Sequence, residues 1–351
     1  MEQSSKRQID LVILNNCPAF YKINLYNELS KQIKIHVIFL AESDQVVIDS
    51  DWKINTHFSF EILSNLEYKK RNIKKNLYLL IFKLRKLNYQ KLIFGGYDAP
   101  EFLILSRFTN KSKNILQYES SIHETKTNGW IGKFKYFVLN NFNIILASGV
   151  SQQEALIKLG FKGKIIITHG VGLINQPEFQ FSLKKNVKKL KYLFVGRLIE
   201  KKNINLLIDV FNQNKKRLTV VGQGPLKSYL QSKAELNIDF IDFVNNDQIK
   251  DIYLSHDVFI LPSFQEPWGL VVEEAIFYGI PVLISNLVGC GETLVKHYST
   301  GIVFQPDFNN LNNAIAKIEE NFMFYKNKCE KFPRYDFNKR QVESYLISIY
   351  Q

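Results

Sequence analysis

Short runs of β-branched and aromatic residues alternate with longer stretches of helical periodicity along the whole chain. The runs are IDLVIL, IKIHVIFL, QKLIFGG, KNILQY, FNIILAS and KIIIT in the first half, and LKYLFVGR, RLTVVGQG, IDFIDFV, DVFILPS and IPVLIS in the second. Strands that alternate with helices in this way are typical of parallel sheets with crossover helices. The pattern therefore predicts an α/β protein with two Rossmann-like layers.

The length of the chain suits two domains. Its 351 residues exceed one average domain, because domains of about 100–200 residues are the usual size. The stretch NQPEFQFSLKKNVKKLK, from Asn175 to Lys191, lacks apolar periodicity and holds Pro177 and several lysines, so it predicts a linker. We expect a Rossmann-like domain over residues 1–175, a linker over 176–190 and a second Rossmann-like domain over 191–332.

The tail over residues 333–351 predicts a final helix. After Pro333 its apolar residues recur at helical spacing, at Val342, Tyr345, Leu346 and Ile349.

Composition narrows the class of protein. With 46% hydrophobic residues the chain is that of a folded globular protein. No apolar run approaches the length of a membrane span, and the N-terminal run Leu11–Leu14 is too short for a signal-peptide core. Cys17, Cys290 and Cys329 stand far apart, in neither disulfide nor zinc spacing. We therefore expect a cytoplasmic protein without a metal site or a membrane-spanning helix.

The positive charge is concentrated in the first half. Residues 1–175 carry 24 Lys/Arg against 14 Asp/Glu, a net +10, while residues 176–351 carry 22 against 19, a net +3. Nucleic acid, phospholipid headgroups and a phosphorylated substrate are the possible anionic partners. The basic, amphipathic stretch from Tyr68 to Leu87 predicts either a helix that lies on an anionic membrane or an ordinary crossover helix with a basic solvent face.

One strand and helix pair contains two unexpected glutamates. Within FILPSFQEPWGLVVEEAIFYGIPVLIS the pattern predicts a strand over Asp257–Leu261, a turn over Ser263–Glu266 and a helix over Pro267–Phe277. Helical spacing puts Glu274 inside the apolar stripe, where a carboxylate needs hydrogen-bond partners such as the hydroxyl groups of a ligand. The alternative is a helix end that points into solvent.

The second glutamate, Glu266, precedes the predicted helix. There it lies beside the backbone N–H groups of Trp268, Gly269 and Leu270, which have no intrahelical partners and favour an anion or a polyhydroxylated ligand. Gly269 would let such a ligand approach the backbone closely. Alternatively, Glu266 only caps its own helix.

A cationic cluster follows the strand in FVGRLIEKKNINLL. Gly196 and Arg197 stand at the end of the strand and Lys202 follows at the start of a helix. Arg and Lys at the carboxyl end of a parallel strand suit a diphosphate. Lys201 is an alternative to Lys202, and a solvated lysine face is the alternative to a site. The turn in VVGQGPL adds a weak Gly-x-Gly-Pro signal.

Taken in order, VGRLIEKKN, VVGQGPL and LPSFQEPWGLVVEEAIFYGIPVLIS resemble the family 4 glycosyltransferases, which are retaining enzymes of the GT-B fold. The decisive match is the Glu-x7-Glu motif from Glu266 to Glu274. NNCPAFYKINLYNEL, FGGYDAPEFLIL and QYESS resemble the polysaccharide and lipopolysaccharide-assembly branch of that family. The resemblance implies two Rossmann-like domains facing across a cleft, with the C-terminal helix returning to the first domain. It assigns the acceptor to the first domain and the nucleotide sugar to the second.

The resemblance also implies roles for individual residues. Arg197 and Lys202 would hold the donor's diphosphate, Glu274 the ribose hydroxyls, and Glu266 with the following amides the donor sugar. The implied donor site comprises Gly196, Arg197, Lys202, Glu266, Pro267, Trp268, Gly269, Leu270 and Glu274. The implied catalytic set is Glu266, Arg197, Lys202 and His123.

Three positions depart from the family pattern. Asn203 stands where the family usually has Gly, Trp268 where it has Phe, and Cys290 at the second position of what is often a Gly-Gly pair. In addition, the first strand-helix turn, NNCPAFY, lacks the glycines that many relatives place against the donor phosphates.

The acceptor side has weaker candidates. His123 and Glu119 follow one predicted strand, and Tyr97 and Asp98 follow another. A satisfied surface histidine is the competing reading of His123. The Asp-Ser-Asp triplet from Asp49 to Asp51 superficially resembles a metal-binding motif, but two Arg/Lys-bearing domains neutralise a diphosphate without a cation. We therefore expect no metal and no cofactor beyond the nucleotide sugar as co-substrate.

The function expected from the sequence is a metal-independent retaining glycosyltransferase of the hexosyltransferase type. It would move a sugar from a nucleotide diphosphate sugar to a hydroxyl of a lipid-linked saccharide in cell-surface polysaccharide biosynthesis, on the inner face of the membrane. The alternatives are an inverting GT-B transferase with His123 as base, a sugar-nucleotide sensor without turnover, and a nucleic-acid-binding protein. Helix-turn-helix, zinc-finger and RNP motifs are missing from the sequence, which argues against nucleic acid.

Overall fold

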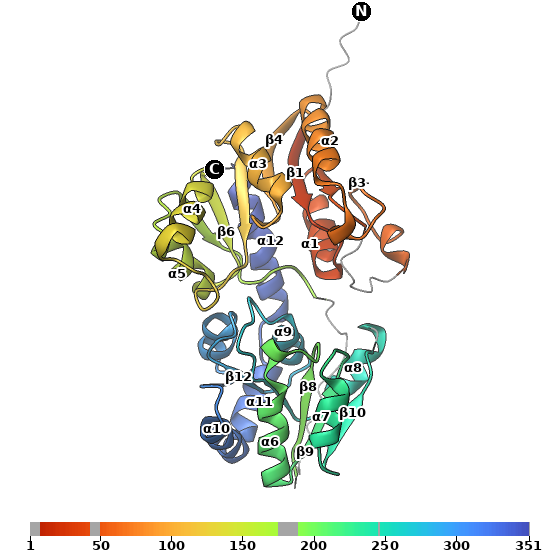
Figure 1. The fold of residues 1–351 in the computed structure, drawn as a ribbon, viewed down its shortest axis with the longest axis vertical. Coiled ribbons are helices and arrows are strands. Elements are labelled where there is room, and N and C mark those ends of the chain that lie inside the picture. The colour runs from red at the N-terminus through yellow and green to blue at the C-terminus, as the bar shows by residue number, and fades with distance from the viewer. Residues whose placement is uncertain (1–7, 43–49, 175–188, 245, 351) are drawn as a thin grey trace, which may run out of the picture. The chain divides into compact units, whose positions relative to one another are not determined.

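The computed structural model describes residues 8–42, 50–174, 189–244 and 246–350, and the chain divides into two compact units (Figure 1). Unit 1 comprises Met1–Glu119, Lys126–Asn175 and Tyr335–Gln351. Unit 2 comprises Ser120–Thr125 and Gln176–Arg334. Apart from its last two positions, the linker predicted over residues 176–190 lies outside the described residues.

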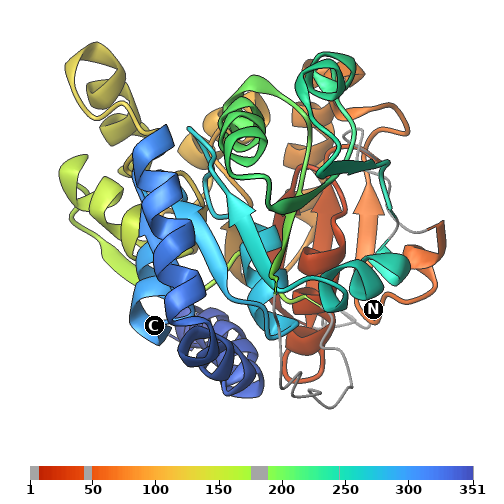
Figure 2. The ribbon, with the colours of Figure 1, turned by 90° about the horizontal axis from the view of Figure 1, so that it is seen from below.

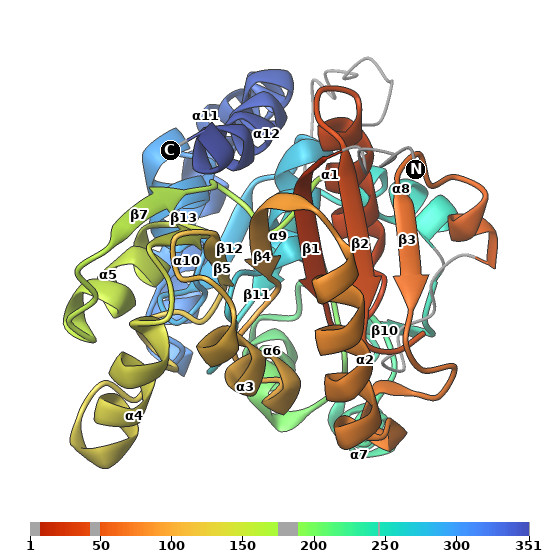
Figure 3. The same ribbon diagram turned by 90° about the horizontal axis from the view of Figure 1, so that it is seen from above.

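Unit 1 is built on a parallel sheet with the strand order β3-β2-β1-β4-β5-β6-β7. Its strands are β1 (Ile9–Asn15), β2 (Ile35–Phe39), β3 (Ser59–Ile62), β4 (Tyr89–Phe94), β5 (Asn114–Tyr118), β6 (Ile144–Ala147) and β7 (Lys164–Ile167). Its helices are α1 (Phe20–Ser30), α2 (Ile73–Lys86), α3 (Pro100–Phe108), α4 (Gly129–Leu139), α5 (Val150–Lys158) and α12 (Arg334–Tyr350), with 3-10 turns at Ser50–Lys53 and Tyr68–Lys70. Figure 3 shows β1, β2 and β3 side by side.

Six strands of unit 1 coincide with predicted runs, and β3 was missed. β3 is four residues long, forms an edge of the sheet and is only half-buried. Its Glu61 forms an ion pair with Lys83 of α2. An edge strand of this kind lacks the continuous apolar run by which a buried parallel strand is recognised.

The C-terminal helix packs into unit 1, as predicted. Val342, Tyr345 and Ile349 of α12 belong to the hydrophobic core that β1 and β2 also form. The Gln117 side chain of β5 donates a 2.7 Å hydrogen bond to the Tyr345 hydroxyl. The tail is thus a structural part of the first Rossmann-like layer, because its apolar stripe completes that core.

Unit 2 contains a second parallel sheet, with the strand order β10-β9-β8-β11-β12-β13. Its strands are β8 (Lys191–Val195), β9 (Arg217–Val221), β10 (Ile238–Ile241), β11 (Val258–Leu261), β12 (Val282–Ser285) and β13 (Gly301–Phe304). Its helices are α6 (Ile204–Asn214), α7 (Lys227–Lys233), α8 (Asn246–Leu254), α9 (Leu270–Phe277), α10 (Phe308–Glu320) and α11 (Phe322–Glu330), with a 3-10 turn at Glu200–Lys202 and a π-helix at Gly291–Lys296. The adjacent helices α6 and α7 are the green pair in Figure 2. The edge strand β13 was not among the predicted runs.

The strand order reverses at one place in each sheet. In unit 2, β8 is followed along the chain by β9 on one side, while β11 and β12 continue on the other. In open α/β sheets, the carboxyl ends of the strands at such a switch point are where ligands bind. A ligand site is therefore expected at the loops after β8 and β11.

Among the described residues, no helix combines the length and the apolar character needed to cross a membrane.

Candidate functional site

Two hydrogen bonds, one between backbones and one from a side chain, hold the loops after β8 and β11 against each other. The Phe264 N–H donates a 2.8 Å hydrogen bond to the Lys201 carbonyl oxygen. The Asn203 side chain donates a 3.3 Å hydrogen bond to the Pro262 carbonyl oxygen. These contacts join the two predicted clusters, which are more than sixty residues apart in the sequence, into one site.

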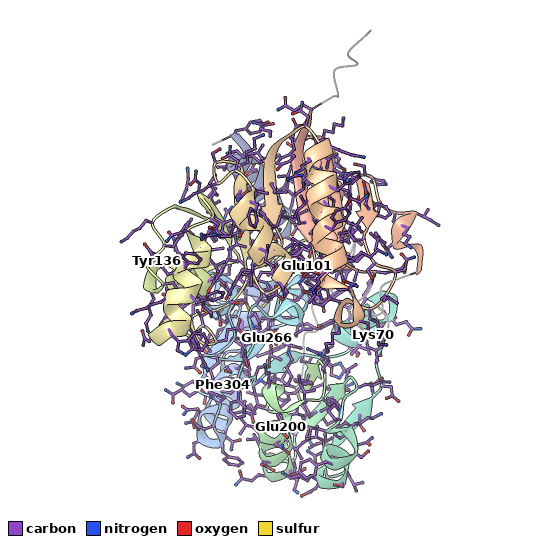
Figure 4. All side chains as sticks on the ribbon, turned by 45° about the horizontal axis from the view of Figure 1, so that its top comes forward. Lys70, Glu101, Tyr136, Glu200, Glu266 and Phe304 are labelled. Carbon is purple, nitrogen blue, oxygen red and sulfur yellow. The ribbon has the colours of Figure 1, made fainter. Side chains whose placement is uncertain are left out.

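Lys202 and Glu266 form an ion pair at this place (Figure 4 labels Glu266). Their side chains are 14% and 15% exposed, so solvent screens the pair less than it would a surface pair. Glu266 does not cap α9, because the N-cap position is Gly269 and no side chain makes a capping hydrogen bond there. The capping interpretation of Glu266 is therefore wrong.

The neighbouring cations of the β8 loop are differently placed. Gly196 lies beside Lys202: a Cβ atom on Gly196 would be 3.9 Å from the Lys202 Cε. Arg197 and Lys201 are exposed, and neither forms an ion pair with any residue that the structure describes. At the end of β8 the loop therefore holds Lys202, which is paired with Glu266, and the exposed guanidinium of Arg197.

Two backbone positions explain why this loop folds as it does. Asn203 has φ +52° and ψ +41°, a left-handed conformation that glycine and asparagine adopt most readily. This accounts for Asn203 where the family usually has Gly. Gly222, which follows β9, has φ +140°, and a Cβ there would lie 2.0 Å from the Gly196 carbonyl oxygen. The weak Gly-x-Gly-Pro signal therefore marks a real close approach to the β8 loop.

The helix predicted from Pro267 begins three residues later, at Leu270. The segment before it pairs with the chain after β12: the Gly289 and Cys290 N–H groups donate 2.9 Å hydrogen bonds to the carbonyl oxygens of Glu266 and Trp268. Gly269 then has φ +100°, and a Cβ there would lie 2.9 Å from a Val288 methyl carbon. This conformation cannot continue a helix, so α9 starts only after it.

Three backbone N–H groups at the start of α9 are unpaired within the described ranges. The N–H groups of Trp268, Gly269 and Leu270 have no hydrogen-bond acceptor among the residues that the structure describes. At the other end of the helix, Arg334 donates to the carbonyl oxygens of Phe277 and Ile276, at 2.7 and 3.0 Å. A helix start with unpaired amides next to Lys202 favours negative charge.

Glu274 is half-buried rather than solvated, and its partner comes from α8. The Tyr253 hydroxyl donates a 2.9 Å hydrogen bond to Glu274 Oε2. Burial raises the pKa of Glu274 to about 7, although the hydrogen bond from Tyr253 acts in the opposite direction. The carboxyl group keeps capacity to accept further hydrogen bonds, as a contact to ligand hydroxyls requires.

A third glutamate, Glu273, is not among the residues expected from the sequence. It is fully buried, and the Trp268 indole N–H donates a 2.9 Å hydrogen bond to its Oε2. Burial raises the pKa of Glu273 to about 8. Trp268 is 3% exposed, so its side chain is closed to a ligand. Two features of the sequence could have indicated this hydrogen bond. Trp268 stands where the family usually has Phe, and two adjacent glutamates, Glu273 and Glu274, interrupt an apolar run.

Cys290 is also explained by its environment. It is buried, and its φ of −82° is open to any residue. Burial, with the negative charges of Glu273 and Glu266 nearby, raises the pKa of its thiol. The position therefore tolerates a side chain where relatives often have glycine.

The remaining candidates are placed as follows. His123 is exposed, in the segment Ser120–Thr125 that belongs to unit 2. Its neighbour Glu124 accepts a 3.0 Å hydrogen bond from Gln265, which precedes Glu266. In unit 1, Glu119 forms an ion pair with the buried Lys22 at 2.5 Å. Tyr97 stacks on Tyr118 with ring centroids 5.4 Å apart.

The Asp49–Asp51 triplet lies outside the residues whose side chains are described. Within the described part of the chain, no group of three His, Cys, Asp or Glu side chains is arranged to hold a metal ion.

Parts of the chain match known proteins in sequence, and the whole chain matches solved structures in fold. Residues 175–336 match the model of the family described as glycosyl transferases group 1. An uncharacterized glycosyltransferase of Methanocaldococcus jannaschii is 30% identical over 171 residues, which span 46% of this chain and 40% of that protein. The O-antigen biosynthesis glycosyltransferase WbnH of Escherichia coli is 27% identical over 267 residues, 72% of this chain and 75% of that protein. A crystal structure of HepE of Anabaena in complex with UDP has a TM-score of 0.71 at 16% identity, covering 96% of this chain and 99% of that one.

Residues 175–336 therefore belong to the group 1 glycosyl transferases, and the two parallel sheets of the chain adopt the GT-B fold. The recognition of family 4 glycosyltransferase motifs in the sequence is confirmed.

The conformation of Gly269 gives a direct test of how the site is built. Gly269→Ala should destabilise the protein by about 1–3 kcal/mol, because alanine at this positive φ is strained and its Cβ meets Val288. Gly291→Ala is the matched control, since a Cβ there meets only side chains at 3.6 and 3.8 Å and its cost should stay below about 0.5 kcal/mol. Denaturant unfolding measures both, and equal costs would contradict the assignment of Gly269.

Proposed function

We propose that the chain transfers a sugar from a nucleotide diphosphate sugar to a hydroxyl of a saccharide, in the biosynthesis of a cell-surface polysaccharide. The observation that carries this proposal is the Lys202–Glu266 pair beside the free amides of Trp268 to Leu270, at the switch point of unit 2. The complex of HepE with UDP and the O-antigen role in the name of WbnH support the substrate class.

The donor diphosphate would bind by competing for Lys202. A diphosphate carries more negative charge than one carboxylate and accepts several hydrogen bonds at once. It would take the Lys202 ammonium from Glu266, accept from the unpaired amides before α9 and recruit the exposed Arg197. These groups stabilise the charge that develops on the departing diphosphate. Glu266, released from Lys202, would then accept hydrogen bonds from the donor sugar.

Glu274 would hold the ribose of the donor. Its carboxyl group is oriented by the Tyr253 hydroxyl, and its remaining lone pairs suit a pair of neighbouring hydroxyl groups. Gly196, Pro267, Gly269 and Leu270 complete the proposed donor site through their backbones. The donor site therefore needs no metal ion in this proposal.

The proposed reaction keeps the anomeric configuration. The acceptor hydroxyl attacks from the same face as the leaving group, and an oxygen of the departing phosphate takes its proton. Glu266 acts through its charge and position and forms no covalent bond. His123, in a segment that contacts the Gln265 loop through Glu124, is the proposed acceptor-side group. NMR of the anomeric proton of the product checks the stereochemistry: inversion would instead favour His123 as a general base.

The acceptor is proposed to be lipid-linked, with unit 1 on the inner face of an anionic membrane. Helices α2, α3 and α4 expose Tyr78 (68%), Phe108 (78%), Trp130 (78%), Phe134 (51%) and Phe137 (53%). An apolar groove of about 490 Å³ lies between α3 and α4. Basic residues are interleaved with these aromatics, and Lys86 and Arg107 stack over Phe82 and Phe137. Exposed aromatics mixed with Lys and Arg suit the headgroup region of a bilayer. The basic stretch expected from the sequence thus forms one part of a wider face.

Donor binding tests the proposed function at Lys202. A thermal-shift panel of UDP-, GDP- and ADP-sugars first finds the base that stabilises the protein. Lys202→Met should then weaken binding of that nucleoside diphosphate by about tenfold to a hundredfold, the equivalent of one charge-assisted hydrogen bond. Titration calorimetry measures the affinity.

Two further variants show whether the loss of affinity in Lys202→Met is specific to Lys202. Lys201→Met removes the same charge from the adjacent exposed residue and should change the affinity less than about threefold. Glu266→Gln should retain nucleotide binding while sugar transfer slows by about a hundredfold or more. Equal loss of affinity in Lys201→Met and Lys202→Met would show that only general charge is sensed, and the proposal would fail.

Membrane association is tested with a pair of equally exposed phenylalanines. Phe134→Ser should lower co-sedimentation with vesicles that contain phosphatidylglycerol, because it removes apolar area from the face. Phe243→Ser in unit 2 changes a side chain of similar exposure, 53% against 51%, and should leave binding unchanged. Equal binding to purely zwitterionic vesicles, or equal effects of the two variants, would contradict the assignment of the face.

A further inference from the structure

The buried side chains of Trp268 and Glu273 have no part in the proposed chemistry, although both residues lie at the start of α9 beside the proposed donor site. Trp268 is 3% and Glu273 0% exposed, and the indole N–H donates to Glu273 Oε2 at 2.9 Å. Glu273 Oε1 has no hydrogen-bond partner among the described residues. A buried carboxyl group with one unpaired oxygen destabilises the fold, so its presence in α9 points to a role.

The position of the pair indicates what that role is. Trp268 lies two residues after Glu266, which pairs with Lys202, and its own amide is the first of the three that would face the proposed diphosphate. Glu273 lies in the first turn of α9. The hydrogen bond therefore ties the segment before the helix to the helix itself, from the buried side. On the other side the same segment is tied by the Gly289 and Cys290 amides.

The charge state of Glu273 fits a structural hydrogen bond better than an ion pair. Glu274 shifts the pKa of Glu273, and Glu273 in turn shifts the pKa of Cys290. Glu266 also acts on the pKa of Cys290. None of these is cationic. Burial raises the pKa of Glu273 to about 8, which favours the neutral carboxyl group, whose carbonyl-type oxygen accepts from the indole. A neutral glutamine would reproduce that acceptor.

We propose that Glu273 is a positioning residue, which holds the Trp268 indole and thereby fixes the Glu266–Leu270 segment where it meets the donor. The nucleotide-binding part of this inference rests on the proposed function. The holding of the segment does not, because it concerns contacts within unit 2 alone. A phenylalanine at position 268 would fill most of the same volume but could not be held by this hydrogen bond.

Two readouts on the full-length chain test the proposal. Hydrogen exchange followed by mass spectrometry reports on the Gly289 and Cys290 amides, which donate to the segment. Calorimetry with UDP, and with GDP and ADP beside it, reports on the site. Glu273→Leu should speed exchange in peptides covering residues 286–292 by about tenfold or more and weaken nucleotide binding by about tenfold.

Variants of Trp268 and Glu273 form a double-mutant cycle, and Glu273→Gln is the conservative variant that should keep the hydrogen bond. Trp268→Phe should have effects similar to Glu273→Leu, and the double variant should be little worse than either single one. Glu273→Gln should restore wild-type exchange and affinity. Trp268→Phe also serves where Glu273→Leu does not fold. Tyr192→Phe is the control, because it removes another hydrogen bond to a carboxylate of unit 2, Tyr192 to Glu319 at 2.7 Å, at the opposite end of β8.

The outcomes separate this inference from the proposed function. Unchanged exchange in Glu273→Leu, an equal effect of Tyr192→Phe, full additivity in the double variant, or failure of Glu273→Gln to restore exchange overturns the positioning role. Altered exchange with intact nucleotide affinity overturns its link to the donor. If the wild-type chain binds none of the three nucleotides, the proposed function fails, and the exchange measurements alone decide whether Glu273 holds the segment.

Discussion

A lysine and a glutamate share one hydrogen bond at the point where the strand order of unit 2 reverses, and the rest of the site is arranged around this pair. Lys202 alone would be a half-buried cation and Glu266 a half-buried anion, each costly to remove from water. Together they are neutral, so the site is stable without ligand. A ligand that supplies more negative charge to Lys202 than Glu266 does would displace the carboxylate and release it for a second task.

Such an exchange needs a rigid surrounding, and the backbone provides it. The loops after β8, β11 and β12 are joined by main-chain hydrogen bonds, while α9 is fixed by Gly269 at its start and by Arg334 at its end. Donors that are held in place before the ligand arrives lose little free energy in reorganising when it binds. This is why residues with no chemistry of their own, such as Asn203 and Gly222, belong to the description of the site.

Much of the fold could be predicted from the sequence because buried parallel strands are continuous apolar runs. The edge strands β3 and β13 were not predicted, although β7 and β10, which are equally short edge strands, were. The start of α9 was misplaced because pairing of Glu266–Trp268 with the chain after β12 overrides the preference of Pro267 for a helix start. Lys202 and Glu266 were found through their spacing from strand ends. Glu273 was not, because the partner of a buried carboxyl depends on side-chain packing that periodicity does not contain.

The most direct test of the central claim is a crystal structure of the protein with the nucleoside diphosphate that it binds. The account predicts that the two phosphate groups contact the Lys202 ammonium, the Arg197 guanidinium and the amides at the start of α9, with Glu266 no longer paired to Lys202. A diphosphate bound elsewhere on the chain, with the Lys202–Glu266 pair intact, would contradict it.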